Sequence, residues 1–274
     1  MMSILTETFP LSSGHRIPKV GFGTWQIPEG SEAYDAVTEA LRVGYRHIDS
    51  ALAYGNERSV GRAIRDSGVP REEVYITTKL PAEIKDAKGA REAFQTSRSN
   101  LDLGPIDLWL IHAPWPWQDI GSDHKAGNIE VWKVFEELYA AEQVRSIGVS
   151  NFDVEDLESL AGHTEVTPHA NQIRWFIGNT QPETTAYCHD RDILVEGYSP
   201  LATGKLLDDD RLSGIAEKYG KSVAQVSIRY LLEKSVLPLP KSVTPARIEA
   251  NAQLDFDLAA DDVAALDQLS NSVD

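Results

Sequence analysis

The chain has a single cysteine, Cys188, among its 274 residues. One thiol cannot form an internal disulfide, which favours a reducing compartment. Cys188 lies in a stretch from Thr184 to Asp190 that predicts a helix, so we interpret it as a packing residue and not as a nucleophile. The sequence also lacks a multi-cysteine or His-Glu-x-x-His pattern, and we therefore predict no metal site.

Long apolar runs and a basic N-terminus are missing as well. Residues 1–10 contain no Lys or Arg, and their apolar runs are shorter than a signal peptide requires. No later run is long enough to cross a bilayer. We therefore expect a cytoplasmic protein, which we take to be monomeric, with no membrane partner.

Basic residues are in deficit. There are 26 Lys and Arg against 42 Asp and Glu, which gives a formal net charge of −16 at pH 7. Nucleic acids and anionic membranes attract basic surfaces, so this charge argues against both as partners. An acidic balance of this kind is typical of a solvated surface. A small molecule is the expected partner.

No Pro/Ser/Gly-rich linker, low-complexity run or short repeat divides the chain. Short β-rich segments alternate with longer amphipathic ones, which is typical of βα units around a parallel sheet. A (β/α)₈ barrel, or TIM barrel, of about 250 residues forms one domain. The sequence therefore predicts an α/β fold in which residues 1–274 form a single TIM barrel.

Turn signals and periodicity place the elements of this barrel. Glu7 to Lys19, with Ser12-Ser13-Gly14 at its centre, predicts a β-hairpin that caps the bottom of the barrel. The strands are expected at 20–24, 46–49, 74–79, 106–112, 146–149, 169–173, 194–197 and 236–239. The expected helices include 32–43, 57–66, one around 131–138, the pair 212–219 and 223–233, and the C-terminal helices 246–252 and 260–269.

Four chemically active residues lie at or just after the ends of predicted strands: Asp49, Tyr54, Lys79 and His112. In a parallel barrel these ends converge on one face, where catalytic groups gather. A phenol is a poor acid, with a pKa of about 10. A nearby ammonium lowers this pKa, and a carboxylate can hold the ammonium in place. The set therefore predicts a general acid that protonates a carbonyl oxygen while hydride reaches the carbonyl carbon.

The segment Gly44-Tyr45-Arg46-His47-Ile48-Asp49-Ser50-Ala51, followed by Tyr54-Gly55-Asn56-Glu57, resembles the signature of the aldo-keto reductases. Further segments resemble the family at matching spacing: 76–79, 147–152, 171–173 and 240–243. The match runs from about Pro18 to Leu269 and is closest to short bacterial members similar to diketogluconate reductases. The resemblance implies reduction of aldehydes or ketones to alcohols with NADPH. Tyr54 would donate the proton, Lys79 would lower its pKa, Asp49 would pair with Lys79, and His112 would orient the carbonyl.

The resemblance also implies a site for NADPH/NADP⁺. Ser150, Asn151 and Gln172 would hydrogen-bond the nicotinamide carboxamide, and Tyr198 would stack on the ring. The segment that opens the helix after the last strand would bind the 2′-phosphate, through Lys241, Ser242, Val243, Thr244 and Arg247. The other residues assigned to the cofactor are Thr24, Ser199, Leu201 and Asn251. Ala250 stands where relatives often hold the adenine with Glu or Gln, which leaves the strength of the NADPH preference open.

The substrate pocket is expected to include Trp25, Ala113 and Trp115. Ala113 stands where many relatives have a bulky aromatic residue, and Leu80 stands where they often have Trp. Both departures predict fewer walls around the reacting carbonyl. Trp117, Trp175 and Phe176 are candidates to supply the missing aromatic surface. Another departure is Arg174, which replaces a Glu found in relatives.

Two other features of the sequence and fold are compatible with different functions. Tyr75 and Lys79 have the spacing of the Tyr-x-x-x-Lys pair of short-chain dehydrogenases, but that pair requires a helix and this segment is β-rich. We interpret the spacing as coincidence. The other alternative is a cofactor-binding regulatory protein on the same fold, as in potassium-channel β-subunits, because a fold does not guarantee an activity. It predicts cofactor binding with negligible turnover.

Overall fold

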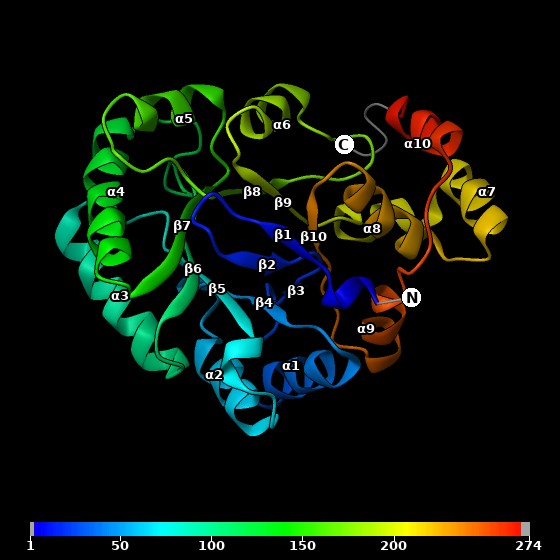
Figure 1. The fold of residues 1–274 in the computed structure, drawn as a ribbon, viewed down its shortest axis with the longest axis horizontal. Coiled ribbons are helices and arrows are strands. Elements are labelled where there is room, and N and C mark those ends of the chain that lie inside the picture. Colours follow the sequence, from blue (N-terminus) through cyan, green and yellow to red (C-terminus); the bar gives the residue numbers. More distant parts are fainter. Residues whose placement is uncertain (1–2, 270–274) are drawn as a thin grey trace.

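The computed structural model describes residues 3–269, and at their centre lies a curled sheet of parallel strands surrounded by helices (Figure 1). Each strand pairs with the next along the chain, so the sheet contains eight strands in sequential order. They are β3 (Phe22–Gly23), β4 (His47–Asp49), β5 (Tyr75–Leu80), β6 (Ile106–Ile111), β7 (Val144–Ser150), β8 (Ala170–Arg174), β9 (Leu194–Tyr198) and β10 (Leu237–Leu239). This order is that of a TIM barrel, as predicted.

The helices form the outer layer (Figure 1). They are α1 (Ser31–Val43), α2 (Glu57–Asp66), α3 (Ala87–Leu101), α4 (Lys125–Ala140), α5 (Val154–Ala161), α6 (Pro182–His189), α7 (Asp210–Tyr219), α8 (Val223–Glu233), α9 (Pro245–Ala252) and α10 (Ala260–Asp267). Short 3₁₀ turns add η1 (Ile4–Thr6), η2 (Leu52–Tyr54), η3 (Arg71–Glu73) and η4 (Ala202–Asp208). The sequence did not reveal these turns, and one of them carries Tyr54.

The first and last strands meet and close the barrel. The amides of Gly21 and Gly23 donate to the carbonyl oxygens of Pro238 and Pro240 at 3.1 and 3.0 Å. Proline has no N–H, so neither Pro238 nor Pro240 can donate a hydrogen bond back to the first strand. β3 spans only Phe22–Gly23, the two residues that pair with Ile48 and Asp49 of β4, and is shorter than the expected strand at 20–24.

A hairpin covers the N-terminal end of the barrel, as predicted. Strands β1 (Thr8–Pro10) and β2 (Arg16–Pro18) pair antiparallel and lie across the barrel in Figure 1. Ile17 is fully buried in an apolar cluster that also holds Tyr75 and Leu237, from the first residues of two barrel strands. The hairpin therefore closes the barrel interior at this end.

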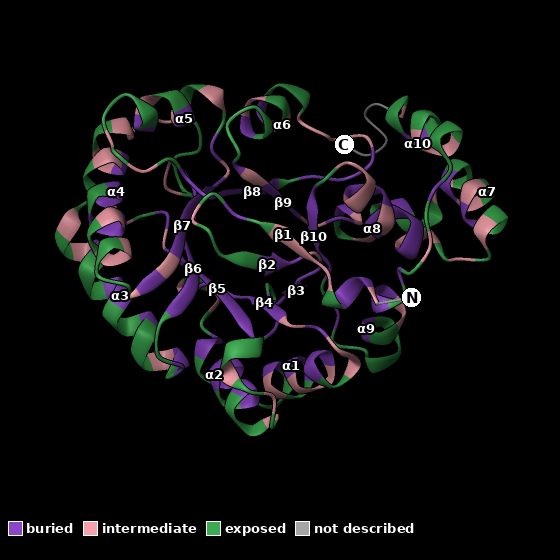
Figure 2. Ribbon diagram, viewed as in Figure 1, coloured by how far each residue is buried: buried purple, intermediate pink, exposed green. Residues whose placement is uncertain are grey.

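The main core lies between the sheet and the helices. The barrel strands are almost wholly buried, whereas the helices are buried on their inner faces only (Figure 2). Trp109 of β6 lies between Phe94 of α3 and Phe135 of α4, with ring centroids at 5.1 and 3.9 Å. Cys188 is fully buried in this core, which supports the packing role. Burying such large rings contributes much of the stability of the fold.

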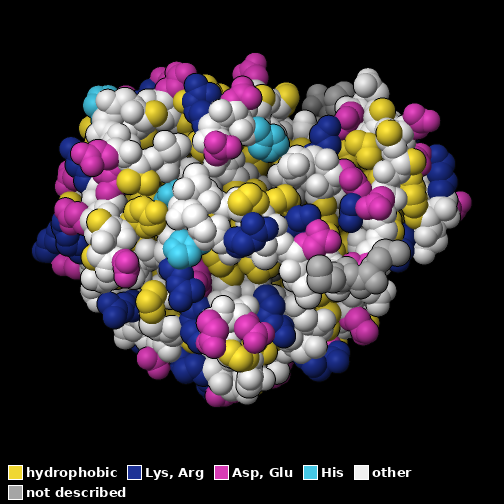
Figure 3. Space-filling view, viewed as in Figure 1, with side chains coloured by type: hydrophobic (Ala, Val, Ile, Leu, Met, Phe, Trp, Pro, Cys, Tyr) yellow, Lys and Arg dark blue, Asp and Glu magenta, His cyan; other side chains and the backbone are white. Residues whose placement is uncertain are grey.

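The surface shown in Figure 3, on the side of the hairpin, intersperses acidic and basic side chains. Among residues 3–269, no helix is long and apolar enough to cross a membrane. The same residues contain no cluster of His, Cys, Asp or Glu suited to holding a metal ion.

Candidate active site

The four predicted catalytic residues meet at the open end of the barrel. Asp49 ends β4, Lys79 lies near the end of β5, His112 directly follows β6, and Tyr54 ends η2. The Lys79 Nζ lies 2.8 Å from each carboxylate oxygen of Asp49 and 2.8 Å from the carbonyl oxygen of Ser50. It also lies 3.4 Å from the Tyr54 hydroxyl. The ammonium is thus held by three oxygens while it faces the phenol.

The electrostatics of this cluster differ in one respect from the expectation. Burial disfavours the charged form of Lys79, but Asp49 and Tyr54 outweigh it and raise its pKa above the usual value. Burial of the Tyr54 hydroxyl raises the pKa of the phenol more than Lys79 lowers it. Lys79 therefore lowers the pKa of Tyr54 as expected, but burial outweighs this effect and the net pKa lies above the usual value. The phenol stays protonated at neutral pH, and the Lys79 ammonium limits the cost of forming the phenolate.

His112 completes the cluster as a neutral imidazole. Its ring contacts the rings of Tyr54 and Trp117 edge-on, with centroids at 5.5 and 5.6 Å. Burial, with a further contribution from the Lys79 charge, lowers the pKa of His112 to about 3. A neutral imidazole can donate a hydrogen bond to a carbonyl oxygen without competing with the phenol as the acid.

Side chains from three neighbouring strands form a hydrogen-bonded row next to the cluster. The Tyr198 hydroxyl donates to Asn151 Oδ1 at 2.8 Å, and Asn151 Nδ2 donates to the His112 carbonyl oxygen at 3.0 Å. The Ser150 hydroxyl donates to the Gln172 carbonyl oxygen at 2.7 Å. Burial raises the pKa of Tyr198 to about 12. The structure thus brings together all four residues that the sequence assigned to the carboxamide and the nicotinamide ring.

Gln172 links this row to the catalytic cluster. Its Nε2 donates to Asp49 Oδ1 and to Glu196 Oε2, both at 2.8 Å. Glu196 is fully buried on β9, and sequence reasoning missed it. The spacing to Tyr198 could have identified it. Glu196 lies two residues before Tyr198 in the same strand, so both side chains point to the same side.

Of the other assigned cofactor residues, Thr24, Ser199 and Leu201 follow barrel strands, whereas Asn251 lies in α9. The Thr24 hydroxyl donates to the Asp49 carbonyl oxygen at 2.9 Å. Ser199 and Leu201 follow β9 and are half-buried. Asn251 is buried in α9.

The proposed phosphate site lies before and in α9. Lys241 and Arg247 are exposed, and neither forms an ion pair with the residues described. The exposed residues Val243 and Thr244 lie between these two cations. The Ser242 hydroxyl accepts the Thr244 N–H at 3.1 Å. Pro245, the first residue of α9, has no N–H. Fewer backbone donors are therefore free here than expected, which leaves most anion binding to the two cations.

The walls of the substrate pocket depart from the expectation. Trp25 is 46% exposed, and Trp117, which is 40% exposed, packs against Trp115 at 5.2 Å. Leu80 is fully buried in the apolar cluster between sheet and helices, because it follows the inward-facing Lys79 in the alternation of β5. The expectation that Leu80 opens the pocket is therefore wrong. Ala113 is also fully buried, and its carbonyl oxygen accepts from Lys85 Nζ at 2.8 Å.

The candidates for compensating aromatic surface separate into two groups. Trp117 contacts His112, whereas Trp175 and Phe176 are buried in the core. The Trp175 indole N–H donates to Thr185 Oγ1 at 3.1 Å. Arg174 is exposed at the end of β8, with its guanidinium 5.0 Å from the centre of the Phe176 ring. Of the three aromatic candidates, Trp117 alone contacts the catalytic cluster.

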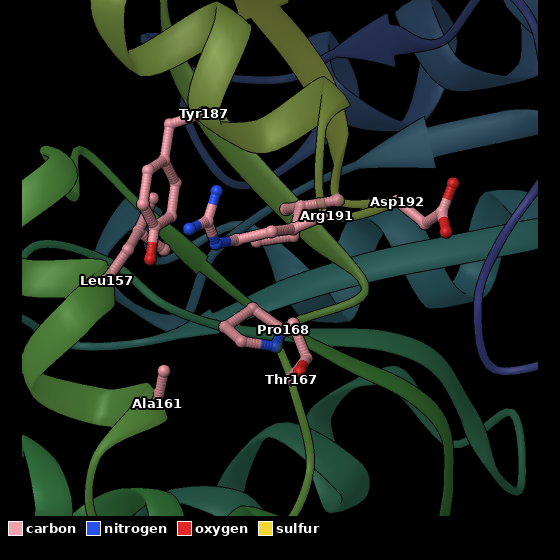
Figure 4. A pocket seen from close by; sticks show the side chains of 8 residues that line it. Leu157, Ala161, Thr167, Pro168, Tyr187, Arg191 and Asp192 are labelled. Atoms are coloured by element: carbon pink, nitrogen blue, oxygen red, sulfur yellow. The ribbon is translucent and has the colours of Figure 1, made fainter.

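A surface hollow lies elsewhere on the molecule (Figure 4). It is lined by side chains of α5 and α6 and by residues that precede β8 and β9, among them Tyr187, Arg191 and Pro168. These positions lie at the N-terminal ends of the strands, opposite the catalytic cluster. The Arg191 guanidinium stacks 3.6 Å from the centre of the Tyr187 ring. The hollow shares no residue with the candidate site.

The sequence profile described as the Aldo/keto reductase family matches residues 19–271. The chain belongs to the aldo-keto reductase family. It is 40% identical to the glyoxal reductase of Bacillus subtilis (strain 168) over 271 residues, covering 98% of this chain and 95% of the relative. It is 41% identical to the methylglyoxal reductase DkgA of Escherichia coli (strain K12) over 264 residues, covering 94% and 92%.

Solved structures agree with this assignment. The crystal structure of an aldo/keto reductase from Brucella melitensis superposes with a TM-score of 0.90 at 43% identity, covering 96% of this chain and 99% of that one. This aldo-keto reductase is therefore an oxidoreductase that acts on carbonyl groups, in a family that uses nicotinamide cofactors.

Proposed function

We propose that this aldo-keto reductase reduces small aldehydes and ketones with NADPH, and that Tyr54 donates the proton. The observation that carries the proposal is the contact of the Tyr54 hydroxyl with Lys79 Nζ at 3.4 Å, while Asp49 holds Lys79 at 2.8 Å. When bound, the nicotinamide supplies the hydride. We infer that one barrel holds cofactor and substrate and acts as a cytoplasmic monomer.

The roles of the four residues follow from their contacts. Tyr54 gives its hydroxyl proton to the carbonyl oxygen, and the Lys79 ammonium stabilises the phenolate that remains. Asp49 holds this ammonium in position. The neutral imidazole of His112, beside the Tyr54 ring, orients the carbonyl oxygen by a hydrogen bond. Proton donation and orientation are thereby assigned to different side chains.

The charges around α9 support NADPH as the cofactor. Lys241 and Arg247 are exposed cations in a chain of formal charge −16. Two cations at the start of a helix favour a phosphate group, and the 2′-phosphate distinguishes NADPH from NADH. Ser150, Asn151, Gln172 and Tyr198 would hold the nicotinamide. Their existing hydrogen bonds fix their positions before the cofactor arrives, which lowers the entropy lost on binding.

The substrates are proposed to be small and to include dicarbonyls. The named relatives are a glyoxal reductase and a methylglyoxal reductase, at 40% and 41% identity. Trp117 contacts His112 and Trp115 packs against Trp117, while Trp25, which the resemblance assigns to the pocket, is exposed just after β3. A pocket of this kind favours compact carbonyl compounds over long chains.

A panel of aldehydes, ketones and dicarbonyls tests the proposal, with turnover followed by the loss of NADPH absorbance. Turnover that is faster with NADPH than with NADH, and highest on small dicarbonyls, is the expected result. Binding of NADPH without turnover on any member of the panel would instead support the regulatory alternative. Failure to bind NADPH would contradict both.

A further inference from the structure

We propose that Glu196 is a positioning residue for the cofactor: with Asp49, it holds the Gln172 amide so that the amide oxygen faces the carboxamide of a bound nicotinamide. The inference rests on the proposed function, because it requires that a nicotinamide cofactor binds beside Gln172. It extends that function to a side chain that contacts neither cofactor nor substrate.

The first observation is how Gln172 uses its two N–H groups. One donates to Asp49 Oδ1 and the other to Glu196 Oε2, each at 2.8 Å. Both partners are carboxyl groups from other strands, β4 and β9. A side-chain oxygen turned toward Asp49 would place lone pairs against a carboxylate. The amide nitrogen therefore faces the two carboxyl groups, which settles an orientation that is often ambiguous for glutamine.

The second observation concerns the opposite side of the amide. No group in residues 3–269 donates a hydrogen bond to Gln172 Oε1. Several other side-chain atoms without a hydrogen-bond partner are completely enclosed by protein, but Gln172 Oε1 is not one of them. It therefore retains contact with solvent. Because the hairpin closes the N-terminal end of the barrel, that contact is at the open end, beside Ser150 and Asn151. A carboxamide N–H is the complementary donor for this oxygen.

The third observation is that Glu196 has no other hydrogen-bond partner in the described part of the chain. It is fully buried, and its Oε1 has no hydrogen-bond partner there. Burying such a group is costly unless it makes hydrogen bonds. Burial and the nearby Asp49 charge raise the pKa of Glu196 to about 7, which reduces this cost because the neutral carboxyl group is easier to bury. The neutral group can still accept the Gln172 N–H through its carbonyl oxygen.

A nucleotide pair tests the role of the amide oxygen without turnover. NADP⁺ carries the carboxamide, whereas its 3-acetylpyridine analogue has a methyl group in place of the amide nitrogen. The dissociation constants of both are measured by quenching of tryptophan fluorescence in the wild type and in variants. We expect the wild type to bind NADP⁺ about threefold to tenfold more tightly than the analogue, as one hydrogen bond would give.

The variants separate positioning from structure. Glu196→Met has a side chain of similar length but no oxygen to accept the Gln172 N–H. The ratio of the two dissociation constants, analogue over NADP⁺, should therefore fall toward one in this variant. Glu196→Gln keeps a carbonyl oxygen for the Gln172 N–H and should retain the preference. If Glu196→Met fails to fold, Glu196→Thr replaces it in the test. Thr is favoured in β-strands, and its side chain is too short to reach Gln172. The control is Glu57→Met, which removes a buried glutamate that is bonded to Thr78 and Asn100 on the outside of the barrel. It should lower stability and leave the preference unchanged.

A double-mutant cycle adds a second criterion. In a Gln172→Met background, Glu196→Met should cause no further loss of preference, because Glu196 acts through the amide. A Glu196→Met protein that keeps the wild-type preference would overturn the inference about Glu196 and leave the proposed function standing. So would a wild type that binds both nucleotides equally. A wild type that binds neither would overturn the proposed function and the inference with it.

Discussion

The ammonium of Lys79 lies 2.8 Å from both carboxylate oxygens of Asp49, and both groups are buried inside the barrel. A buried ion pair is sustained only by close geometry and further hydrogen bonds. Here the Ser50 carbonyl oxygen completes the shell of Lys79, and Gln172 donates to Asp49. This arrangement places one positive charge beside the Tyr54 hydroxyl, and several consequences can be measured.

Tyr54→Phe should abolish reduction while NADPH affinity stays nearly unchanged. The hydroxyl is needed only when the carbonyl oxygen takes its proton, so the loss falls on kcat, by about 10²–10⁴-fold. Steady-state kinetics and fluorescence titration with NADPH measure the two quantities. A variant that keeps more than about a tenth of the wild-type kcat would exclude Tyr54 as the acid.

Removing one member of the buried pair should destabilise the protein strongly. Lys79→Met leaves the Asp49 carboxylate buried beside Glu196 without its cation, at a cost of about 3–5 kcal/mol in the free energy of unfolding. Asp49→Asn with Lys79→Met removes both charges and should recover much of that loss without recovering activity. Urea denaturation of the two variants measures the difference. Equal stability of the single and double variants would argue against a charge-based cost.

Lys241→Ala and Arg247→Ala should each weaken NADPH binding much more than NADH binding. Each removes a charge-assisted contact of roughly 1.5–3 kcal/mol to a phosphate that NADH lacks. The matched control is Lys133→Ala, which removes an exposed cation from α4, far from α9. Titration of each variant with the two nucleotides gives the comparison. Equal losses for both nucleotides would show that these cations do not recognise the 2′-phosphate.

Stability should fall in mild acid because several histidines are buried in their neutral form. Burial lowers the pKa of His169 to about 4, while the Ile147 N–H donates to its ring at 2.9 Å. The unfolded chain, with a histidine pKa of about 6.5, binds the proton first as pH falls. Stability is therefore full above that value and is lost between about 6.5 and 4, by about 1.4 kcal/mol per pH unit for one histidine.

His169→Asn tests this dependence. Asn can accept the same backbone N–H but does not titrate, so the variant should lose less stability between pH 7 and pH 5. His47 and His112, whose pKa values burial lowers to about 3, keep titrating in both proteins. Urea denaturation at the two pH values gives the slopes. Parallel slopes for wild type and variant would contradict the assignment.

The sequence allowed the barrel and its catalytic cluster to be predicted for a physical reason. Parallel strands end on one face, so residues that follow β-rich segments converge even when they are far apart in the chain. Asp49 and Lys79 were predicted in this way. The net pKa shift of Tyr54 could not be, because it depends on how deeply η2 buries the hydroxyl. Glu196 could not be predicted from strand ends, because it lies inside β9.

The pocket was the least predictable part. Leu80 was assigned to it by comparison with relatives, although its position after Lys79 directs it to the other side of β5. Trp117 was only one of three candidates, since its contact with His112 depends on the path of the loop between β6 and α4. A loop path is set by tertiary contacts that local sequence does not encode. Lys85 supplies one, through the Ala113 carbonyl oxygen.

The departure at Ala113 suggests that Ala113→Trp would refill the pocket, but the structure argues against this. Because Ala113 is fully buried, a Trp at this position would overpack the barrel and cost stability. The position that controls pocket size is instead expected to be Trp117, whose ring meets His112 at 5.6 Å.

Trp117→Ala should therefore raise KM for small aldehydes and dicarbonyls and improve kcat/KM for bulky aromatic substrates. Truncation removes apolar surface beside the reacting carbonyl, so a small substrate loses contact area that a larger one can replace. The control is Ile120→Ala, which truncates a residue in the same loop that is 67% exposed. Kinetics on a size series of aldehydes measure the preference. If both variants shift it equally, the loop as a whole and not the Trp117 ring sets the pocket; if neither shifts it, the pocket wall lies elsewhere.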